Sequence, residues 1–334
     1  MSTMLCWSFL LFTMLTQDAS KEILTPELRA AVDRGLDFLE SMQNPDGSFG
    51  TDARDREAHI GVTALAGLAF LAGGHQPGRG PRGKASARCL EAVLSALDAE
   101  SGLIVTQRTY ASPMYSHAFA ALYLAEVYGA SRRADVGLAL RRAIDAIVAA
   151  QNPGGGWRYY PGSKDADLSV TACQINALKA ARNAGIAVPR ETLDRARAYV
   201  LACRNPNGSF RYQVEYGQST FHLTAAAVTC LQHLGEDDAE VIDAAFSWLQ
   251  TYFPAGEKPV RGHFHYGQYY ALQAAALRAP EIFATWSVRL RDRLLEQQAE
   301  SGAFAEATVG EIYGTAMSLI LLQLPFHYLP VLIR

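Results

Sequence analysis

The chain has 334 residues, of which 49% are hydrophobic and 19% charged, and it carries a net charge of −3 at pH 7. This composition is typical of a globular protein and excludes a low-complexity chain. Because Lys and Arg are interspersed with Asp and Glu, we expect no basic surface for nucleic acid or for an anionic membrane.

The first twenty residues differ from the rest of the chain. Leu5 to Leu15 form an apolar run of the length found in signal peptides, too short to span a bilayer. Asp18-Ala19-Ser20 offer a loose cleavage site, although no Lys or Arg precedes the run. The sequence therefore predicts a signal peptide at residues 1–20 and a secreted, periplasmic or cell-envelope protein. The alternative is a hydrophobic N-terminus that is retained. No later segment is apolar enough to cross a membrane.

Three nearly identical turns show that the chain is built from repeats. They read QNPDGSFG from Gln43, QNPGGGWRY from Gln151 and RNPNGSFRY from Arg204, and a diverged copy, QQAESGAFAEA, starts at Gln297. Each turn follows one helical stretch and precedes another. A fixed repeat of this length predicts tandem helix pairs.

The second helix of each pair has its own signature, as in HIGVTALAGLAFLAGG and DLSVTACQINALKAARNAG. Aligning the six copies gives successive spacings of 56, 52, 53, 46 and 45 residues for one column. Gly or Pro closes nearly every copy, as expected at a helix C-terminus. The column contains Thr63, Phe119, Thr171, Thr224, Tyr270 and Thr315.

The two kinds of helix differ in their polarity. The second helices are apolar nearly all round, which predicts burial on every side. The first helices, such as LRRAIDAIVAA, alternate apolar and charged positions with helical spacing. An inner ring of buried helices inside an outer amphipathic ring follows. The predicted fold is therefore all-α, an (α/α)6 toroid in one domain over residues 24–334. An open superhelix of helix pairs is the alternative.

The same residues resemble a known family. The QNPDGSFG and QNPGGGW turns resemble the Gln-Trp repeats of squalene–hopene cyclases. The segments MYSHAFAALYLAEVYG and LQLPFHYLPVLIR are similar to those of bacterial prenyltransferase/squalene-oxidase-repeat proteins. The resemblance extends from about Leu24 onward. It implies a terpene cyclase-like toroid, whereas it says less about activity, because one fold hosts many functions.

Polar residues recur at the start of the inner helices. In the six aligned helices, the residues four and two positions before the shared column mostly carry hydroxyl, imidazole, phenol or carboxyl groups. In a closed barrel these helix starts share one end of a central cavity, where we expect a ligand pocket. Each residue alone could also be a helix cap. The residues predicted to bind a ligand are His59, Tyr115, His222, His265, Tyr266, Tyr269, Glu311 and Tyr313.

Asp165-Ala166-Asp167-Leu168 resembles the Asp-x-Asp-Asp motif with which class II terpene cyclases protonate an alkene or epoxide. The resemblance implies that Asp167 is the acid, with Asp165 as its neighbour. Leu168 replaces the last Asp, so the tuning of an acid here is weakened and ordinary squalene–hopene cyclisation is not expected. We predict one polar cluster in which Asp165, His117, His222, His265 and Tyr313 support Asp167. If the protein is an enzyme, Asp167, Asp165 and His117 are its candidate catalytic residues.

No metal or cofactor is predicted. Protein prenyltransferases bind zinc through an Asp-x-Cys pair and a distant His, and this chain has no Asp-x-Cys. A metal site formed by His117, His222, His263 and His265 is the alternative. Cys203 and Cys230 are candidates for a disulfide, although isolated buried thiols are the default for such cysteines.

The sequence thus predicts a toroid that binds a hydrophobic or isoprenoid-type small molecule in its central cavity, and it leaves catalysis open. A non-catalytic scaffold or binding module of the cell envelope is the first alternative. A carbohydrate-active (α/α)6 enzyme is the second, suggested by tyrosines in the loops. The shape and lining of the cavity distinguish the three.

Overall fold

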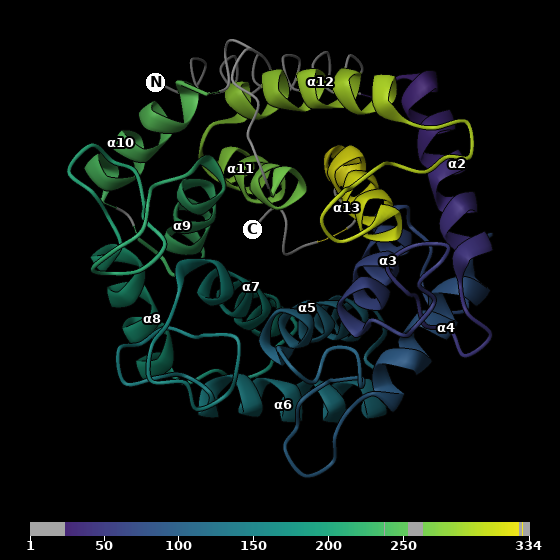
Figure 1. Cartoon of the computed structure of the whole chain (residues 1–334), viewed down its shortest axis with the longest axis horizontal. Helices are drawn as coiled ribbons and strands as arrows, with labels where there is room; N and C mark the ends of the chain where they lie inside the picture. The colour runs from purple at the N-terminus through teal and green to yellow at the C-terminus, as the bar shows by residue number, and fades with distance from the viewer. Residues whose placement is uncertain (1–23, 237, 253–262, 327–328, 330–334) are drawn as a thin grey trace, which may run out of the picture.

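The structure, a computed structural model, describes residues 24–236, 238–252, 263–326 and 329. Within them, twelve α-helices and one short 3₁₀ helix, Leu324–Phe326, are joined by loops with isolated β-bridges. The helices form two concentric rings (Figure 1). The outer ring contains α2 (Pro26–Met42), α4 (Gly83–Ser95), α6 (Ala134–Ala149), α8 (Arg190–Ala202), α10 (Ala239–Gln250) and α12 (Pro280–Gln297). The inner ring contains α3 (Ile60–Ala72), α5 (Pro113–Ser131), α7 (Leu168–Asn183), α9 (Phe221–His233), α11 (Phe264–Arg278) and α13 (Glu311–Gln323).

Burial separates the two rings as the sequence predicted. Every residue of α3 is buried, whereas α2 buries one stripe that includes Leu28, Leu36 and Leu39. A helix without a polar face is stable only when neighbours cover it on all sides, and the outer ring provides that cover. The all-α toroid prediction is confirmed.

The ring closes because the last repeat binds the first. The side-chain amide of Gln298, which follows α12, donates to the carbonyl oxygen of Ala31 in α2 at 2.8 Å. In the inner ring, Gln323 of α13 donates to the carbonyl oxygen of Ala69 in α3 at 3.0 Å. An open superhelix would leave these two ends apart, so that alternative is wrong for this chain.

A repeated Gln-Gly turn attaches three of the helix pairs to the next one. Gln151 donates to the carbonyl oxygens of Gly155, at 2.8 Å, and of Thr192 in α8, at 2.9 Å. Gly155 has a φ of +92° and lies so close to α8 that an added Cβ would be 2.3 Å from the carbonyl oxygen of Arg195. The same arrangement recurs at Gln43 with Gly47 and at Gln298 with Gly302.

The threonine column holds the aromatic end of each turn. The amide of Trp157 donates to Thr171 Oγ1 at 3.0 Å, and the amides of Phe49, Phe210 and Phe304 make the equivalent bonds. In the second repeat the amide of Ile104 donates to Nδ1 of His117 at 3.0 Å. His117, not Phe119, therefore occupies the column, and the predicted alignment is wrong there by two residues. Because α5 is buried on nearly all sides, its apolar pattern could not fix the register.

Three smaller predictions concern the remainder of the chain. Cys203 and Cys230 are buried free thiols, so the disulfide is not formed. No described helix has both the length and the apolar character needed to span a bilayer. The predicted signal peptide, residues 1–20, lies outside the described residues.

Candidate functional site

A cavity of about 780 Å³ lies at the N-terminal ends of the inner helices. This volume is within the range of small-molecule sites. Apolar side chains, among them Val62, Leu65 and Leu223, line it together with rings. The aromatic rings are Tyr115, Phe119, Tyr159, Tyr212, Tyr266 and Tyr313, and the imidazoles are His59, His222 and His263.

Five predicted ligand-binding residues line this cavity: His59, Tyr115, His222, Tyr266 and Tyr313. His59 also caps α3, where its ring accepts from the amide of Val62 at 3.3 Å. Burial lowers the pKa of His59, and burial together with the neighbouring imidazole of His263 lowers the pKa of His222 to about 4. Both rings are therefore neutral near pH 7 and act there as uncharged hydrogen-bonding groups.

Three other predicted residues lie outside the cavity lining. His265 turns toward α13, where its Nε2 is 3.0 Å from Ser318 Oγ. Tyr269 is buried further along the barrel, and its hydroxyl accepts from Asn176 at 2.9 Å. Glu311, the first residue of α13, accepts weakly from the amide of Ala53 at 3.4 Å. A helix buried on all sides presents some of its polar residues to neighbouring helices, as His265 and Tyr269 show. Glu311 is half-buried and contacts the loop that contains Ala53.

The predicted polar cluster is not formed, because its members face different ways. His117 is fully buried, and its two ring nitrogens contact the amide of Ile104 and the carbonyl oxygen of Ala143 in outer helix α6. Its burial lowers its pKa to about 4, so the ring is neutral near pH 7. His117 is thus a structural link between the two rings and lies away from the cavity.

Asp167 is the N-cap of α7 and is fully buried. Its Oδ1 accepts from Ser169 Oγ at 2.6 Å and from the amide of Val170 at 2.9 Å, and its Oδ2 accepts from Arg158 at 2.8 Å. It does not line the cavity. Asp165, whose side chain is 58% exposed, pairs with Arg158 at 3.2 Å. Asp167 thus pairs with Arg158 and caps α7.

Sequence reasoning missed several residues of the site. Tyr159 and Tyr212 come from loops, and each stands two residues after the aromatic residue of a Gly-rich turn, within the repeated phrase Arg-Tyr. That repetition was the available signal. Arg108 at the mouth pairs with Asp55 at 2.5 Å and with Glu57 at 3.4 Å.

The four-histidine metal site is wrong for this structure, because His117 and His265 make the bonds described above. His222 and His263 alone are neighbours, with ring centroids 4.9 Å apart. Among the residues that the structure describes, no three His, Cys, Asp or Glu side chains gather as metal ligands would.

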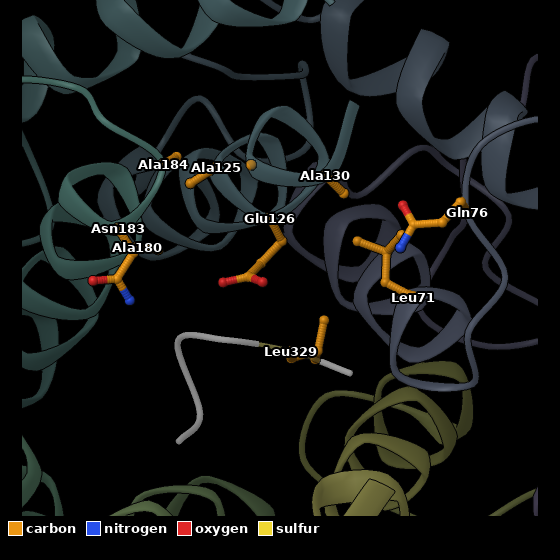
Figure 2. Close-up of a pocket in the computed structure, with 10 residues that line it drawn as sticks. Leu71, Gln76, Ala125, Glu126, Ala130, Ala180, Asn183, Ala184 and Leu329 are labelled. Atoms are coloured by element: carbon orange, nitrogen blue, oxygen red, sulfur yellow. The ribbon is translucent and has the colours of Figure 1, made fainter. Parts of the chain in front are cut away.

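A second cavity, of about 200 Å³, lies at the opposite end of the barrel. Glu126 and Asn183, from the C-terminal parts of α5 and α7, surround it together with Leu71, Gln76 and Leu329 (Figure 2). It has about a quarter of the volume of the first cavity. The larger cavity, where aromatic and polar side chains of all six inner helices or their loops converge, is the candidate site.

Comparison with known proteins identifies the family. The profile of the prenyltransferase alpha-alpha toroid domain matches residues 3–91 and 115–254, more than half of the chain. Drimenyl diphosphate synthase from Streptomyces showdoensis is 30% identical over 186 residues, covering 55% of this chain and 32% of that protein. The enzyme of the same name from Streptantibioticus cattleyicolor is 34% identical over 105 residues, covering 31% of this chain and 19% of that protein. The chain thus spans a third or less of these curated relatives.

Solved structures share the fold. The type II terpene cyclase MstE from Scytonema superposes with a TM-score of 0.63 at 17% identity, covering 90% of this chain and 98% of that one. An alpha-1,6-mannanase variant from Salegentibacter gives 0.65 at 8% identity, with coverage of 89% and 98%. The cellobiose 2-epimerase from Spirochaeta thermophila gives 0.64 at 14% identity, with coverage of 90% and 98%. At such identities the similarity shows the toroid fold and leaves the chemistry to the residues of the site.

Proposed function

The chain belongs to the prenyltransferase alpha-alpha toroid family, and on this premise we propose that it binds an elongated hydrophobic ligand of isoprenoid type. The observation that carries the proposal is the cavity of about 780 Å³ with its lining of aromatic rings and apolar side chains. Burying an apolar chain there gains about 25 cal/mol per Å² of apolar surface removed from water.

The comparisons support this ligand class. The curated relatives are drimenyl diphosphate synthases, and one MstE variant was solved with geranylgeranyl dihydroxybenzoate bound as its substrate. The carbohydrate alternative rests on neighbours of equal structural similarity, the mannanase and the epimerase. Glycosidases act through paired carboxylates beside the bond to be broken. Among the described residues that line the cavity none is an Asp or a Glu, and most of the lining consists of phenols, imidazoles, hydroxyls and apolar groups, which favours the isoprenoid class.

The proposal concerns binding and includes no proton-initiated reaction. In the class II scheme Asp167 would deliver a proton into the cavity. Here its oxygens accept three hydrogen bonds, one of them from a guanidinium, and Ser169 and Tyr115 stand between the carboxylate and the cavity. The tyrosine faces can stabilise a cationic ligand or a developing positive charge.

Filling the cavity is expected to weaken binding. Leu65 lines the cavity from α3, and the substitution Leu65→Trp replaces its side chain with a larger indole ring in the space of the ligand. We expect a loss of affinity for geranylgeraniol of at least about tenfold, or 1.4 kcal/mol, in a fluorescence or calorimetric titration. Leu138→Trp is the matched control, because Leu138 is 52% exposed on outer helix α6. Equal binding by both variants, or none by the native protein, would reject the proposal.

We also propose that residues 1–20 direct export to the cell envelope or beyond. Support comes from the apolar run Leu5 to Leu15 and the small residues that follow it. The intact mass of the protein isolated from its native host tests this proposal. A mass lacking the first twenty or so residues is expected, and the full-length mass would contradict it.

A further inference from the structure

One wall of the cavity is a network of hydrogen bonds centred on Asp167. It includes Tyr115 of α5, Ser169 of α7, Tyr159 from the loop after α6 and Tyr212 from the loop after α8. All four side chains line the cavity. We call Tyr115, Tyr159, Ser169 and Tyr212 the tyrosine wall. These residues come from successive repeats, and only the closed packing of the helix pairs brings them together.

The backbone fixes the tyrosine wall in place. The amide of Leu168 donates to the carbonyl oxygen of Tyr212 at 2.9 Å, and the amide of Met114 donates to that of Tyr159 at 3.3 Å. Behind the wall, the guanidinium of Arg158 stacks on the rings of Tyr159 and Tyr212, at 4.5 and 5.5 Å from their centroids. The wall therefore has little freedom to rearrange, which lowers the entropic cost of using it as a binding surface.

The direction of the hydrogen bonds can be derived from their ends. An ionised carboxylate only accepts, so the hydroxyl of Ser169 donates its single hydrogen to Asp167, 2.6 Å away. Ser169 Oγ must then accept from Tyr115, whose hydroxyl is 2.6 Å away. The hydrogen of Tyr115 is thus directed into the wall, and a lone pair of its oxygen remains to accept a bond from the cavity.

The Tyr159–Tyr212 pair supplies a hydrogen-bond donor that complements the acceptor of Tyr115. Tyr212 accepts from Arg158 at 2.7 Å and is 2.7 Å from the hydroxyl of Tyr159. The contact between the two phenols uses one of their two hydrogens, whichever donates. The bonds described here leave the other hydrogen available as a donor. Whichever phenol keeps this hydrogen, it belongs to the Tyr159–Tyr212 pair, and the ring of Tyr159 lies 5.9 Å from that of Tyr115, centroid to centroid. The donor and the Tyr115 acceptor therefore belong to the same wall of the cavity.

One donor beside one acceptor matches a hydroxyl group, which both donates and accepts. We propose that the tyrosine wall binds the hydroxyl end of an otherwise hydrophobic ligand, an alcohol or a phenol, while its chain lies against Leu65 and Phe119. This inference rests on the proposed function, because it assigns one end of the ligand within the same cavity. Asp167 and Arg158 are positioning residues here, since they act on the ligand through the tyrosines.

The test compares geranylgeraniol with its methyl ether, which keeps the chain and the oxygen but cannot donate. A site that hydrogen-bonds a hydroxyl rejects the analogue that lacks its hydrogen, and one such bond corresponds to about three- to tenfold in affinity. The native protein is expected to prefer the alcohol by that factor. In Tyr115→Phe, which removes the acceptor, the two affinities should become equal.

Tyr313→Phe is the matched control. Tyr313 lines the same cavity from α13, outside the tyrosine wall, and its loss should leave the preference unchanged. If the native protein binds both compounds equally well, the hydroxyl inference is overturned while the proposed function stands. If it binds neither compound, both are overturned. A preference that persists in Tyr115→Phe also overturns the assignment to this wall.

Discussion

Replacing Arg158 with methionine is expected to lower the free energy of unfolding by about 3–5 kcal/mol. Asp167 has no exposed surface, and Arg158 supplies the opposite charge at 2.8 Å. Removing the guanidinium leaves a buried carboxylate without its opposite charge, although Ser169 and the amide of Val170 still donate to it. Such a loss costs more than an intact pair contributes. The rings of Tyr159 and Tyr212 also lose the cation stacked on them. Urea unfolding followed by circular dichroism measures the change.

Two further variants test whether the loss of stability comes from the unpaired buried charge. Asp167→Asn keeps an oxygen that can cap α7, because Asn and Asp serve equally well at that position. Adding it to Arg158→Met should recover part of the lost stability, since the buried charge is then absent. Arg133→Met removes a partner of Asp135 in an exposed pair and should cost less than about 1 kcal/mol. A loss of that size for Arg158→Met as well would show that the buried pair does not support the site.

Replacing Gly155 with alanine is expected to destabilise the protein by about 2–5 kcal/mol. The left-handed backbone of this residue, at φ +92°, is unfavourable for alanine, and its new Cβ would collide with the carbonyl oxygen of Arg195 at 2.3 Å. Since the carbonyl belongs to the backbone of α8, the turn itself must move away from the outer ring. Thermal or urea unfolding measures the effect.

Gly162→Ala is the control for this substitution. Gly162 also has a positive φ, +75°, but no atom lies within 4 Å of its added Cβ. It should lose only the conformational term, about 1–2 kcal/mol. Equal losses at Gly155 and Gly162 would mean that the close approach of the turn to α8 contributes nothing, and that the repeated Gly serves its own turn alone.

The fold could be predicted because each repeat can be recognised from a short stretch of sequence. Gln recurs in three of the turns because Gln43, Gln151 and Gln298 each bind their own turn and the next outer helix, and Gly155 shows the close approach to α8 that favours Gly. Inner helices are apolar all round and outer helices are amphipathic because the two kinds of helix differ in burial, and this difference can be read from the spacing of hydrophobic residues. Closure by Gln298 on Ala31 joins residues at opposite ends of the chain, and the sequence left it open by keeping an open superhelix as the alternative.

The site was predicted only in part, for a geometric reason. Polar residues at the inner-helix starts indicated the correct end of the barrel, and His59, Tyr115 and His222 do line the cavity there. On a helix that is buried all round, however, the pattern does not tell which polar residue faces the centre. His117 and His265 face other helices for that reason.

The contacts of Asp167 depend on Arg158, which no motif in the sequence identified as its partner. In sequence the Asp-x-Asp segment indicated an acid, whereas Arg158, nine positions earlier, pairs with it in space. The loop between them folds back through a β-bridge between Trp157 and Asp167. Such a loop contact lies outside what helical periodicity can predict.

The central claim, an isoprenoid-type ligand in the barrel, is tested most directly by a crystal structure of the protein grown with geranylgeraniol. The account predicts a continuous chain of density in the cavity at the N-terminal ends of the inner helices, in contact with Leu65 and Phe119. The hydroxyl should lie between Tyr115 and Tyr159. Ordered water alone in that cavity at a saturating concentration of geranylgeraniol, or the ligand bound elsewhere on the molecule, would contradict it.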